Sequence, residues 1–523
     1  MTRVMGRMLA VLLGCGVVGA AEWEESLARK FSGRLDGIDE ELKGIEAELV
    51  ELPTLPLDDQ GGTGGFASLH PEERGEFPIT IDWDGPAEVD FVALVPARRY
   101  EIDGLNRQYG MPDAFRVELT DAGGKVVATV AEVDKAWKHP VRAGHPFVFE
   151  VEPAVEASGV RIVGLRLGRD GDRFVHAWSE VFVYGGEQDR TLEAGVENPG
   201  GQSPPAPWQW SAPFLIDGQT PLGLPELPAG EHRNIGWLSQ GRERADKVTW
   251  LELDLGESRG FERLRLLPAR RPTSDLPSGF GFPQAFQVKV AEQREELDSM
   301  VPVVERSMRN PGHNPVTVPL GEVEGRYVRV EATRLWKPFE SYPAFFALSE
   351  VELWDGDENV ALGARVRSPD GMGNVIASGA RFWTTVSLCD GFGPDGRLVP
   401  VREWLGALDR RLDLETERHD LRREAAGIVA GWRRAAFWGL GLLGGVGGLA
   451  LVVLPLRYRV RERQQLRKVR ERIAGDLHDE VGSNLGSIQM LADLAEGRTG
   501  PSKELGRIQR IAAETASAER DSV

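Results

Sequence analysis

The chain is poor in cysteine: its 523 residues contain only two, Cys15 and Cys389. Cys15 falls in an N-terminal leader, so a processed chain would keep a single thiol, and a framework of internal disulfides is excluded. The cysteines therefore do not show whether the protein lies in an oxidising or a reducing compartment. That has to be inferred from the N-terminal leader. The length is too great for one ordinary domain and indicates about three or four.

Basic residues are outnumbered by acidic ones over most of the chain. The net charge is -19, and residues 21–456 alone carry -23, because the first twenty residues and residues 457–523 each have two more basic than acidic side chains. Nucleic-acid binding needs clustered Lys and Arg against phosphates. Direct binding of nucleic acid by the acidic middle part is therefore not expected.

The first hydrophobic run lies at the N-terminus. Arg3 and Arg7 precede an apolar core at 8–18, and small residues follow at 18–20. This pattern predicts a secretory signal peptide over residues 1–20. The stretch Leu-Leu-Gly-Cys ending at Cys15 also resembles a lipoprotein cleavage box, so processing at that cysteine stays an alternative.

The second hydrophobic run, residues 435–456, has 22 residues and no charge. At 1.5 Å rise per residue it would be about 33 Å long, enough to cross a bilayer as a helix. Its length and six glycines argue against a buried soluble helix. Residues 457–472 follow with eight basic and two acidic side chains, and positively charged flanks stay in the cytoplasm. We therefore expect a single-pass protein of a bacterial cytoplasmic membrane, with residues 21–434 outside and 457–523 inside.

The outer part contains an internal repeat. Four blocks recur in the same order at an offset of 168 to 172 residues: 79–99 with 251–271, 110–118 with 281–289, 160–167 with 328–335, and 179–184 with 349–354. Preserved order and spacing indicate a duplication. Each copy reads as short alternating strands, with Phe115, Val117 and Leu119 facing one way, separated by Gly/Pro turns. This pattern predicts two β-sandwiches.

These copies resemble discoidin-type, galactose-binding-like jelly rolls. The resemblance rests on an L-x-D-G step at 215–218, Gly236-Trp237, and the closing segment that ends in L-S-E-V-E-L-W at 348–354. It implies β-sandwich domains at 65–190 and 205–356. A further L-C-D-G at 388–391 falls in 357–400, which is interpreted as a partial third repeat or linker.

Members of that family often bind sugars or lipid headgroups through loops at one end of the barrel, so an unknown extracytoplasmic ligand, carbohydrate among the options, is expected. Aromatic candidates for stacking on a sugar are Trp208, Trp210 and Trp336, but filling the core is the favoured role for these rings. His145 and His313 occupy equivalent places in the two copies and are interpreted as turn caps rather than metal ligands. No ligand-binding residue and no metal site is assigned.

Two amphipathic helices flank the duplicated region, at 22–52 and 402–434. Their apolar residues recur at steps of three and four, which fits helices paired as a coiled coil. Because the second helix leads into the apolar run at 435–456, movement outside could be transmitted inward.

Past the membrane, apolar residues continue at steps of three and four from Leu466 through Leu477 to Leu491, and a second helix follows a turn at 497–501. Two helices with narrow apolar stripes bury little surface alone, so a homodimer through the 457–523 hairpin is expected to form a four-helix bundle. The fold class is thus multidomain: two all-β jelly rolls, one transmembrane helix and a C-terminal helical hairpin.

A histidine and an aspartate, His478 and Asp479, stand side by side in this hairpin. With eight histidines in the chain, such a pair means little by itself, and a second pair occurs at His419-Asp420. That second pair is flanked by arginines on the outer side, where ATP is absent. Context therefore favours His478.

The stretch 471–488, ERIAGDLHDEVGSNLGSI, resembles the dimerisation and phosphoacceptor helix of HisKA_3-like sensor histidine kinases. The resemblance implies that His478 is the phosphorylated residue and Asp479 the orienting or general-base group. A neutral imidazole is a competent nucleophile, and an adjacent carboxylate can fix its tautomer. Ser483 stands where family members with strong phosphatase activity often carry Gln, which puts dephosphorylation of a partner in doubt.

The resemblance also implies ATP as phosphate donor and a response regulator as acceptor. No ATP-binding domain follows the hairpin in the given sequence, so ATP is expected to bind not to this chain as shown but to a domain missing through truncation or supplied in trans. The resulting hypothesis is a sensor histidine kinase of a two-component system. The alternative is a membrane-anchored carbohydrate- or surface-binding protein with a non-catalytic, dimerising kinase remnant. A secreted carbohydrate hydrolase is disfavoured, since no convincing carboxylate pair is present.

Overall fold

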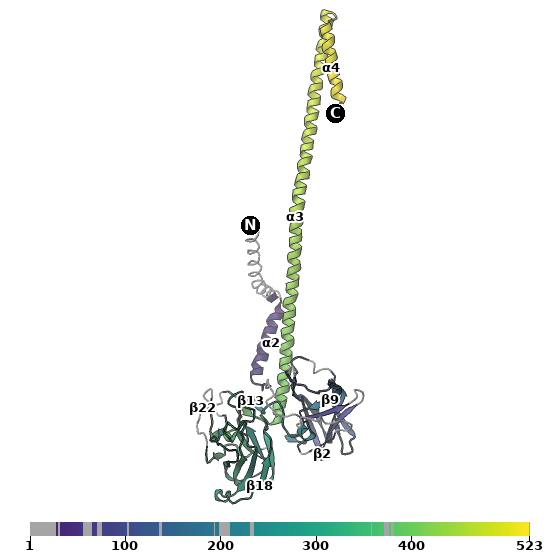
Figure 1. The fold of residues 1–523 in the computed structure, drawn as a ribbon. Helices are drawn as coiled ribbons and strands as arrows, with labels where there is room; N and C mark the ends of the chain where they lie inside the picture. The colour runs from purple at the N-terminus through teal and green to yellow at the C-terminus, as the bar shows by residue number, and fades with distance from the viewer. Residues whose placement is uncertain are drawn as a thin grey trace. The chain divides into compact units, whose positions relative to one another are not determined.

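The computed structural model describes residues 28–29, 32–55, 65–70, 76–101, 104–134, 139–192, 194–197, 210–230, 235–356, 358–370, 376–377 and 381–521. The chain divides into two compact units, Arg34–Ala425 and Met1–Gly33 with Ala426–Val523. The predicted signal peptide at 1–20, Cys15 and Trp208 lie outside the described residues. The larger unit contains two antiparallel β-sheet domains, which confirms the multidomain β architecture predicted from the repeat (Figure 1).

The first β domain is built around two long strands, β2 and β7. They pair along residues 77–82 with 159–164 and again along 87–94 with 147–157. The main sheet has the order β11-β10-β2-β7-β5-β6, with β12 on β2, and a smaller sheet has the order β1-β9-β8. The strands are β1 (Phe66–His70), β2 (Phe77–Val95), β3 (Arg99–Glu101), β4 (Gly104–Asn106), β5 (Ala114–Thr120), β6 (Val126–Asp134), β7 (Phe147–Arg166), β8 (Gly168–Asp170), β9 (Arg173–Trp178), β10 (Glu180–Gly185), β11 (Gln188–Asp189) and β12 (Gly195–Glu197).

The second β domain repeats this topology. Its sheet has the order β14-β19-β15-β18-β16-β17, with β20 on β19 and β21 on β15, so β15 and β18 take the places of β2 and β7. The strands are β14 (Trp237–Leu238), β15 (Thr249–Pro268), β16 (Ala285–Ala291), β17 (Val304–Ser307), β18 (Val316–Arg334), β19 (Ala347–Asp355), β20 (Glu358–Asn359) and β21 (Arg365–Arg367). The path β10-β2-β7-β5-β6 of the first domain thus recurs as β19-β15-β18-β16-β17, as a duplication would produce.

Shorter elements connect and close these domains. Two further strand pairs form, β13 with β24 and β22 with β23. Their bounds, and those of the 3-10 helices, are β13 (Glu226–Pro228), β22 (Ile376–Ala377), β23 (Arg381–Phe382), β24 (Gly396–Leu398), η2 (Ala212–Leu215), η3 (Arg294–Glu296) and η4 (Thr385–Leu388).

The alternation of apolar and polar residues along the strands predicts which side chains form the core. Phe115, Val117 and Leu119 of β5 are fully buried, as their spacing predicted. They pack with Trp178 in the core of the first domain, and an equivalent cluster around Phe286 fills the second. The apolar residues of the period-2 pattern therefore fill the core, although Glu118 and Thr120 between and beside them are buried too.

The two L-x-D-G segments, at 215–218 and 388–391, belong to other domains than the sequence suggested. Leu215 belongs to the core of the first β domain, and Leu388 belongs to the core of the second. The step at 215–218 thus closes the domain that precedes it, and the step at 388–391 does the same for the second domain. The second L-x-D-G is a closing element, not a partial third repeat, because its apolar side chain completes a core that already exists.

A buried carboxylate holds each closing step. Glu180 of β10 accepts the Gly218 N–H at 3.0 Å, and the equivalent Glu350 of β19 accepts the Gly391 N–H at 2.7 Å. Both glycines have positive φ, at +74° and +79°, a conformation that favours glycine. Burial raises the pKa of Glu350 to about 10 and the pKa of Glu180 well above its usual range. Burial therefore favours the neutral form of the carboxyl group at both closures.

Helix α2 (Gly33–Val50) lies alongside the first part of α3 (Val401–Thr499) in the larger unit, as expected from the two amphipathic patterns (Figure 1). The apolar stripe of α2 is buried, and ion pairs join the two helices. These pairs are Arg34–Glu424 at 2.9 Å, Arg410–Glu48 at 2.7 Å and Arg422–Glu46 at 3.0 Å.

The start of α3 docks on the first β domain. Trp404, Leu405 and Leu408 are buried in one cluster with Phe91 and other side chains of β2 and β10. Nearby, the Arg402 guanidinium contacts an Asp90 carboxylate oxygen at 3.0 Å and the Gly186 carbonyl at 2.8 Å. The periodicity of apolar residues predicted the helix, but only the folded structure shows the surface on which it docks.

The second unit contains the rest of α3 and α4 (Lys503–Asp521). Among the described residues, α3 is the one helix long and apolar enough to cross a membrane by length and composition. Its large side chains within 435–456, such as Leu442 and Leu451, are exposed. Helix α4 folds back along the end of α3 (Figure 1).

Candidate functional site

His478 and Asp479 lie on α3, one residue apart and so about 100° apart around the helix. Both side chains are exposed to solvent. Within the described residues, neither side chain makes a hydrogen bond or ion pair. The imidazole is therefore accessible to a reactant, and the expected orienting contact from Asp479 stays a prediction.

The helix around His478 carries an uncovered apolar stripe. Val469, Ile473 and Leu477 follow one another at steps of four, on one side of the helix. Their exposed fractions are 52%, 53% and 56%. Side chains of this size are usually buried, and a contiguous exposed apolar surface marks an interaction site. His478 stands next to this stripe, one position after Leu477.

Hydrogen bonds at the turn between α3 and α4 end the first helix and begin the second. Gly500 adopts φ +83°, and its N–H donates to the Glu496 carbonyl at 3.0 Å, which ends α3 with a left-handed glycine. The Ser502 hydroxyl accepts a backbone N–H at the start of α4. Ala492 of α3 and Ala512 of α4 are buried where the two helices meet. Small side chains let the two helices approach closely, so the pair forms a hairpin, as predicted.

Comparison with protein families gives a match at this hairpin. Residues 469–523 match the HisKA_3 family, described as histidine kinase. The chain carries a HisKA_3 domain at its C-terminus. The HisKA_3 domain includes His478 and Asp479, the exposed part of α3 around them and the whole of α4. The resemblance drawn from the motif at 471–488 is thereby confirmed for this part of the chain.

Several solved structures are similar to the part of the chain before the HisKA_3 domain. A fucolectin from striped bass (Morone saxatilis) serum is 12% identical, with a TM-score of 0.16, over 58% of this chain and 96% of that one. A fucose-binding module of Streptococcus pneumoniae is 17% identical, with a TM-score of 0.15, over 22% and 69%. The CBM32-1 and CBM32-2 domains of Clostridium perfringens ZmpB are 7% identical, with a TM-score of 0.18, over 60% and 96%. At these TM-scores no conclusion about ligand rests on the likeness. Comparison with curated proteins gave no match.

The aromatic and histidine candidates of the β domains have structural surroundings. Trp210 and Trp336 are buried, in line with the core role favoured for them. His145 is also buried, beside α3, and burial lowers its pKa to about 4. His313 lines a pocket instead. The structure thus does not bring the two histidines together.

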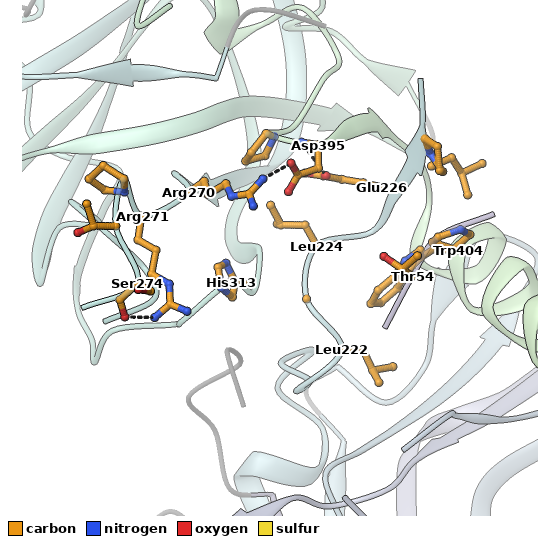
Figure 2. Close-up of a pocket in the computed structure, with 17 residues that line it drawn as sticks. Thr54, Leu222, Leu224, Glu226, Arg270, Arg271, Ser274, His313, Asp395 and Trp404 are labelled. Carbon is orange, nitrogen blue, oxygen red and sulfur yellow. Dashed lines mark hydrogen bonds and ion pairs between the residues drawn. The ribbon is translucent and has the colours of Figure 1, made fainter. Parts of the chain in front are cut away.

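That pocket, of about 590 Å³, is lined by residues of the second β domain, of the segment 222–228 and of the start of α3 (Figure 2). Arg270 forms an ion pair with Asp395, and Arg271 donates to the Ser274 carbonyl at 3.2 Å. The lining mixes charged and polar side chains with prolines and leucines, and its indole, Trp404, is buried. The pocket therefore offers hydrogen-bonding groups, and its indole presents no exposed face for stacking.

These arginines were not among the residues predicted from the sequence to have a function. A signal was present, because Pro-Ala-Arg-Arg occurs in both copies, at 96–99 and 268–271. In the first copy the same four residues make a different contact. The Arg99 guanidinium forms an ion pair with the Asp170 carboxylate at 2.6 Å. The repeat marks the position, but the partner residues, which are far away in sequence, decide what each arginine does.

Proposed function

We propose that the protein is a single-pass sensor histidine kinase of a two-component system. Its outer β domains bind an extracytoplasmic ligand, and His478 of the HisKA_3 domain accepts a phosphoryl group and passes it to an aspartate of a response regulator. One observation carries this proposal: the family match coincides with a Leu-His-Asp step whose histidine is exposed beside an uncovered apolar stripe.

The proposed chemistry uses one imidazole. An unprotonated ring nitrogen of His478 attacks the γ-phosphorus of ATP, the new N–P bond forms as the bond to ADP breaks, and ADP leaves. Asp479 is proposed to accept the hydrogen bond of the other ring N–H, which orients the ring and balances its developing positive charge. In the second step a regulator carboxylate oxygen attacks the same phosphorus, and the neutral imidazole is released. ATP is held by an ATP-binding domain and not by the hairpin.

A homodimer is proposed through the hairpin. Covering Val469, Ile473 and Leu477 in a partner would remove about half of each side chain from water, and two hairpins together make a four-helix bundle. His478 would stay at the edge of the buried seam, because it lies about 100° from Leu477 around the helix.

The membrane arrangement is proposed from composition and exposure. The uncharged run 435–456 has exposed apolar side chains, which lipid would cover, and the basic segment 457–472 supports a cytoplasmic position for the HisKA_3 domain. Residues 21–434 would then lie outside the cytoplasmic membrane, following a signal peptide at 1–20. The two β domains are proposed to be discoidin-like jelly rolls.

The ligand is proposed to be recognised by the β domains, and carbohydrate is the class that the resemblance to galactose-binding-like domains favours. Helix α3 supports the transmission step, because its start is buried against the first β domain through Trp404 and Leu405. A ligand that changes this docking would act directly on the helix that leads to the apolar run.

The test is phosphate transfer to the chain from radiolabelled ATP, with a histidine kinase ATP-binding domain supplied as a separate polypeptide. We expect an acid-labile, base-stable label that is lost in His478→Gln. His419→Gln is the matched control, since His419 is also followed by an aspartate, and it should keep the label. Asp479→Asn should slow labelling.

Label that survives in His478→Gln would contradict the proposal. Absence of label in the unaltered chain, under conditions where the supplied domain phosphorylates its own partner, would favour a membrane-anchored surface-binding protein whose HisKA_3 domain only dimerises.

A further inference from the structure

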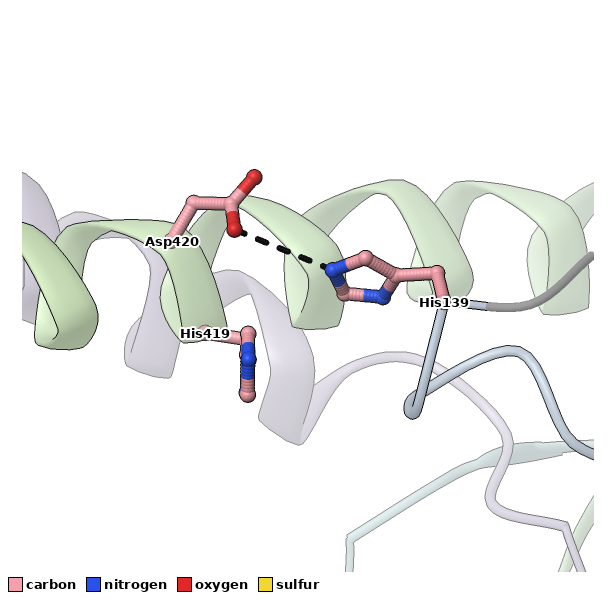
Figure 3. A group of neighbouring side chains, drawn as sticks. All are labelled: His139, His419 and Asp420. Atoms are coloured by element: carbon pink, nitrogen blue, oxygen red, sulfur yellow. Dashed lines mark ion pairs between the residues drawn. The ribbon is translucent and has the colours of Figure 1, made fainter. Parts of the chain in front are cut away.

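The second His-Asp pair of the chain, which the proposed phosphotransfer does not use, meets a third side chain in the larger unit. His419 and Asp420 lie on α3, and His139 reaches them from the segment between β6 and β7 (Figure 3). His139 Nε2 is 3.7 Å from Asp420 Oδ1, and the two imidazole centroids are 5.1 Å apart. One nitrogen or oxygen atom of each of the three residues lies within 4.8 Å of the other two.

An ion pair alone does not account for this group. A protonated His139 would pair with Asp420, yet that side chain is 63% exposed, and exposed pairs stabilise a protein by only about 0–1 kcal/mol. It would also leave His419 edge-on to a cationic ring, at 85° between the ring planes. Two imidazoles and a carboxylate that converge are instead the donor set of a divalent transition metal.

Two nearby arginines are paired elsewhere and do not compete for Asp420. Arg422, two positions along α3, is paired with Glu46 at 3.0 Å, and Arg34 is paired with Glu424 at 2.9 Å. Both guanidinium groups are thus held in ion pairs between α2 and α3. The Asp420 carboxylate is left facing His139 and solvent.

We propose that His139, His419 and Asp420 bind a divalent transition metal ion, with Zn²⁺ as the best fit. Ligand atoms in a tetrahedral zinc site lie about 3.3 Å apart, given bonds near 2.0–2.1 Å. The present separations of up to 4.8 Å therefore require side-chain shifts of about 1 Å, which partly exposed rotamers allow. Water completes the fourth position, as in zinc sites with three protein ligands.

Binding has one local consequence for His139. Its Nδ1 accepts the Val141 N–H at 3.5 Å, a long contact. Metal bound at Nε2 requires the ring proton on Nδ1, so this contact is given up. Both imidazoles bind the ion as neutral ligands.

The site would tie the first β domain to α3. His139 belongs to the domain, whereas His419 and Asp420 lie sixteen and fifteen residues before the apolar run at 435–456. A bound ion adds a coordination link to the apolar docking of Trp404 and Leu405 nearer the start of the helix. The ion thereby restrains the helix at a second point, and this consequence does not depend on phosphotransfer.

The experiment uses the full chain without a polyhistidine tag, in detergent micelles, stripped of metal. Zinc is titrated in competition with a chromophoric chelator, and Co²⁺ is added separately to record its d–d absorption. We expect one site with a tetrahedral Co²⁺ spectrum. His139→Asn and His419→Asn, which change ligands on two different elements, should each weaken zinc binding by at least tenfold, and Asp420→Asn should weaken it less.

The matched control is His313→Asn. His313 is the second domain's equivalent of His145 and lies outside the group of three proposed metal ligands. This variant should bind zinc like the unaltered chain. Zinc should also raise the thermal midpoint of the unaltered chain but not that of His139→Asn, whose far-UV circular dichroism shows whether it is folded. Zinc affinity unchanged in both histidine variants, or absence of a site in the unaltered chain, overturns the proposal.

Discussion

Replacing Glu350 by Gln should change how the stability of the second β domain depends on pH. A carboxyl whose pKa is higher in the folded than in the unfolded chain gains a proton on folding. Its contribution to stability is therefore largest below the unfolded pKa and declines as pH rises toward the folded pKa. For Glu350 this window runs from about 4.5 to about 10, because burial raises its pKa.

The magnitude follows from the width of that window. Each pH unit inside it removes about 1.4 kcal/mol of folding free energy per carboxyl. Between pH 6.5 and 8.5 the second β domain should thus lose about 3 kcal/mol through Glu350. Glutamine stays neutral and keeps an oxygen that can accept the Gly391 N–H, so Glu350→Gln should abolish this loss and be more stable than the unaltered domain at pH 8.5.

The assay is equilibrium unfolding in guanidinium chloride of residues 34–425, followed by tryptophan fluorescence at several pH values. Glu180→Gln should flatten the pH dependence of the first β domain only. Glu352→Gln is the control: that carboxylate lies on the same strand and contacts Arg265 at 3.2 Å, so its loss should lower stability at every pH and leave the slope intact.

Two results would refute the reasoning. One is a second β domain whose stability is level from pH 6.5 to 8.5. The other is a Glu350→Gln variant that is about 1.5–3 kcal/mol less stable at all pH values, the cost expected for losing hydrogen bonds to a charged acceptor. Either would mean that the backbone N–H groups keep Glu350 ionised despite its burial.

Three further outcomes are expected. Gly236→Ala should unfold the second β domain, seen as loss of its fluorescence transition, because Gly236 has φ +108° and an added Cβ would lie 2.1 Å from a carbonyl oxygen of the neighbouring strand. His176 accepts the Trp178 Nε1–H at 2.9 Å and burial lowers its pKa to about 3, so the first β domain should lose about 1.4 kcal/mol per pH unit below 6.5, and His176→Gln should reduce that loss in acid denaturation. Leu477→Lys should shift the chain from dimer to monomer in analytical ultracentrifugation if the exposed stripe is the dimer seam; an unchanged mass would place the seam elsewhere.

Local sequence patterns predicted the role of a side chain wherever that role depends on residues nearby in the sequence. Alternation along β5 predicted that Phe115 is buried, and steps of three and four predicted the α3 stripe through Leu477. The Leu-His-Asp step was recognisable because its residues lie within one helix turn. The L-x-D-G step at 388–391 was misplaced, since nothing local shows that Leu388 fills a core built by strands that come before it.

The sequence by itself determined the duplication, the apolar run, the hairpin and the position of His478, because each is a periodic or contiguous feature that secondary structure converts directly into a face or a length. Only the tertiary structure decided that Glu350 is buried against Gly391, that Trp404 docks on the first β domain, and that His139 meets His419. These residues are separated by 41 to 313 positions along the chain in their respective contacts, and no propensity or spacing rule links residues so far apart. Their proximity follows from how two β domains and a helix pack, which burial of the whole apolar surface decides.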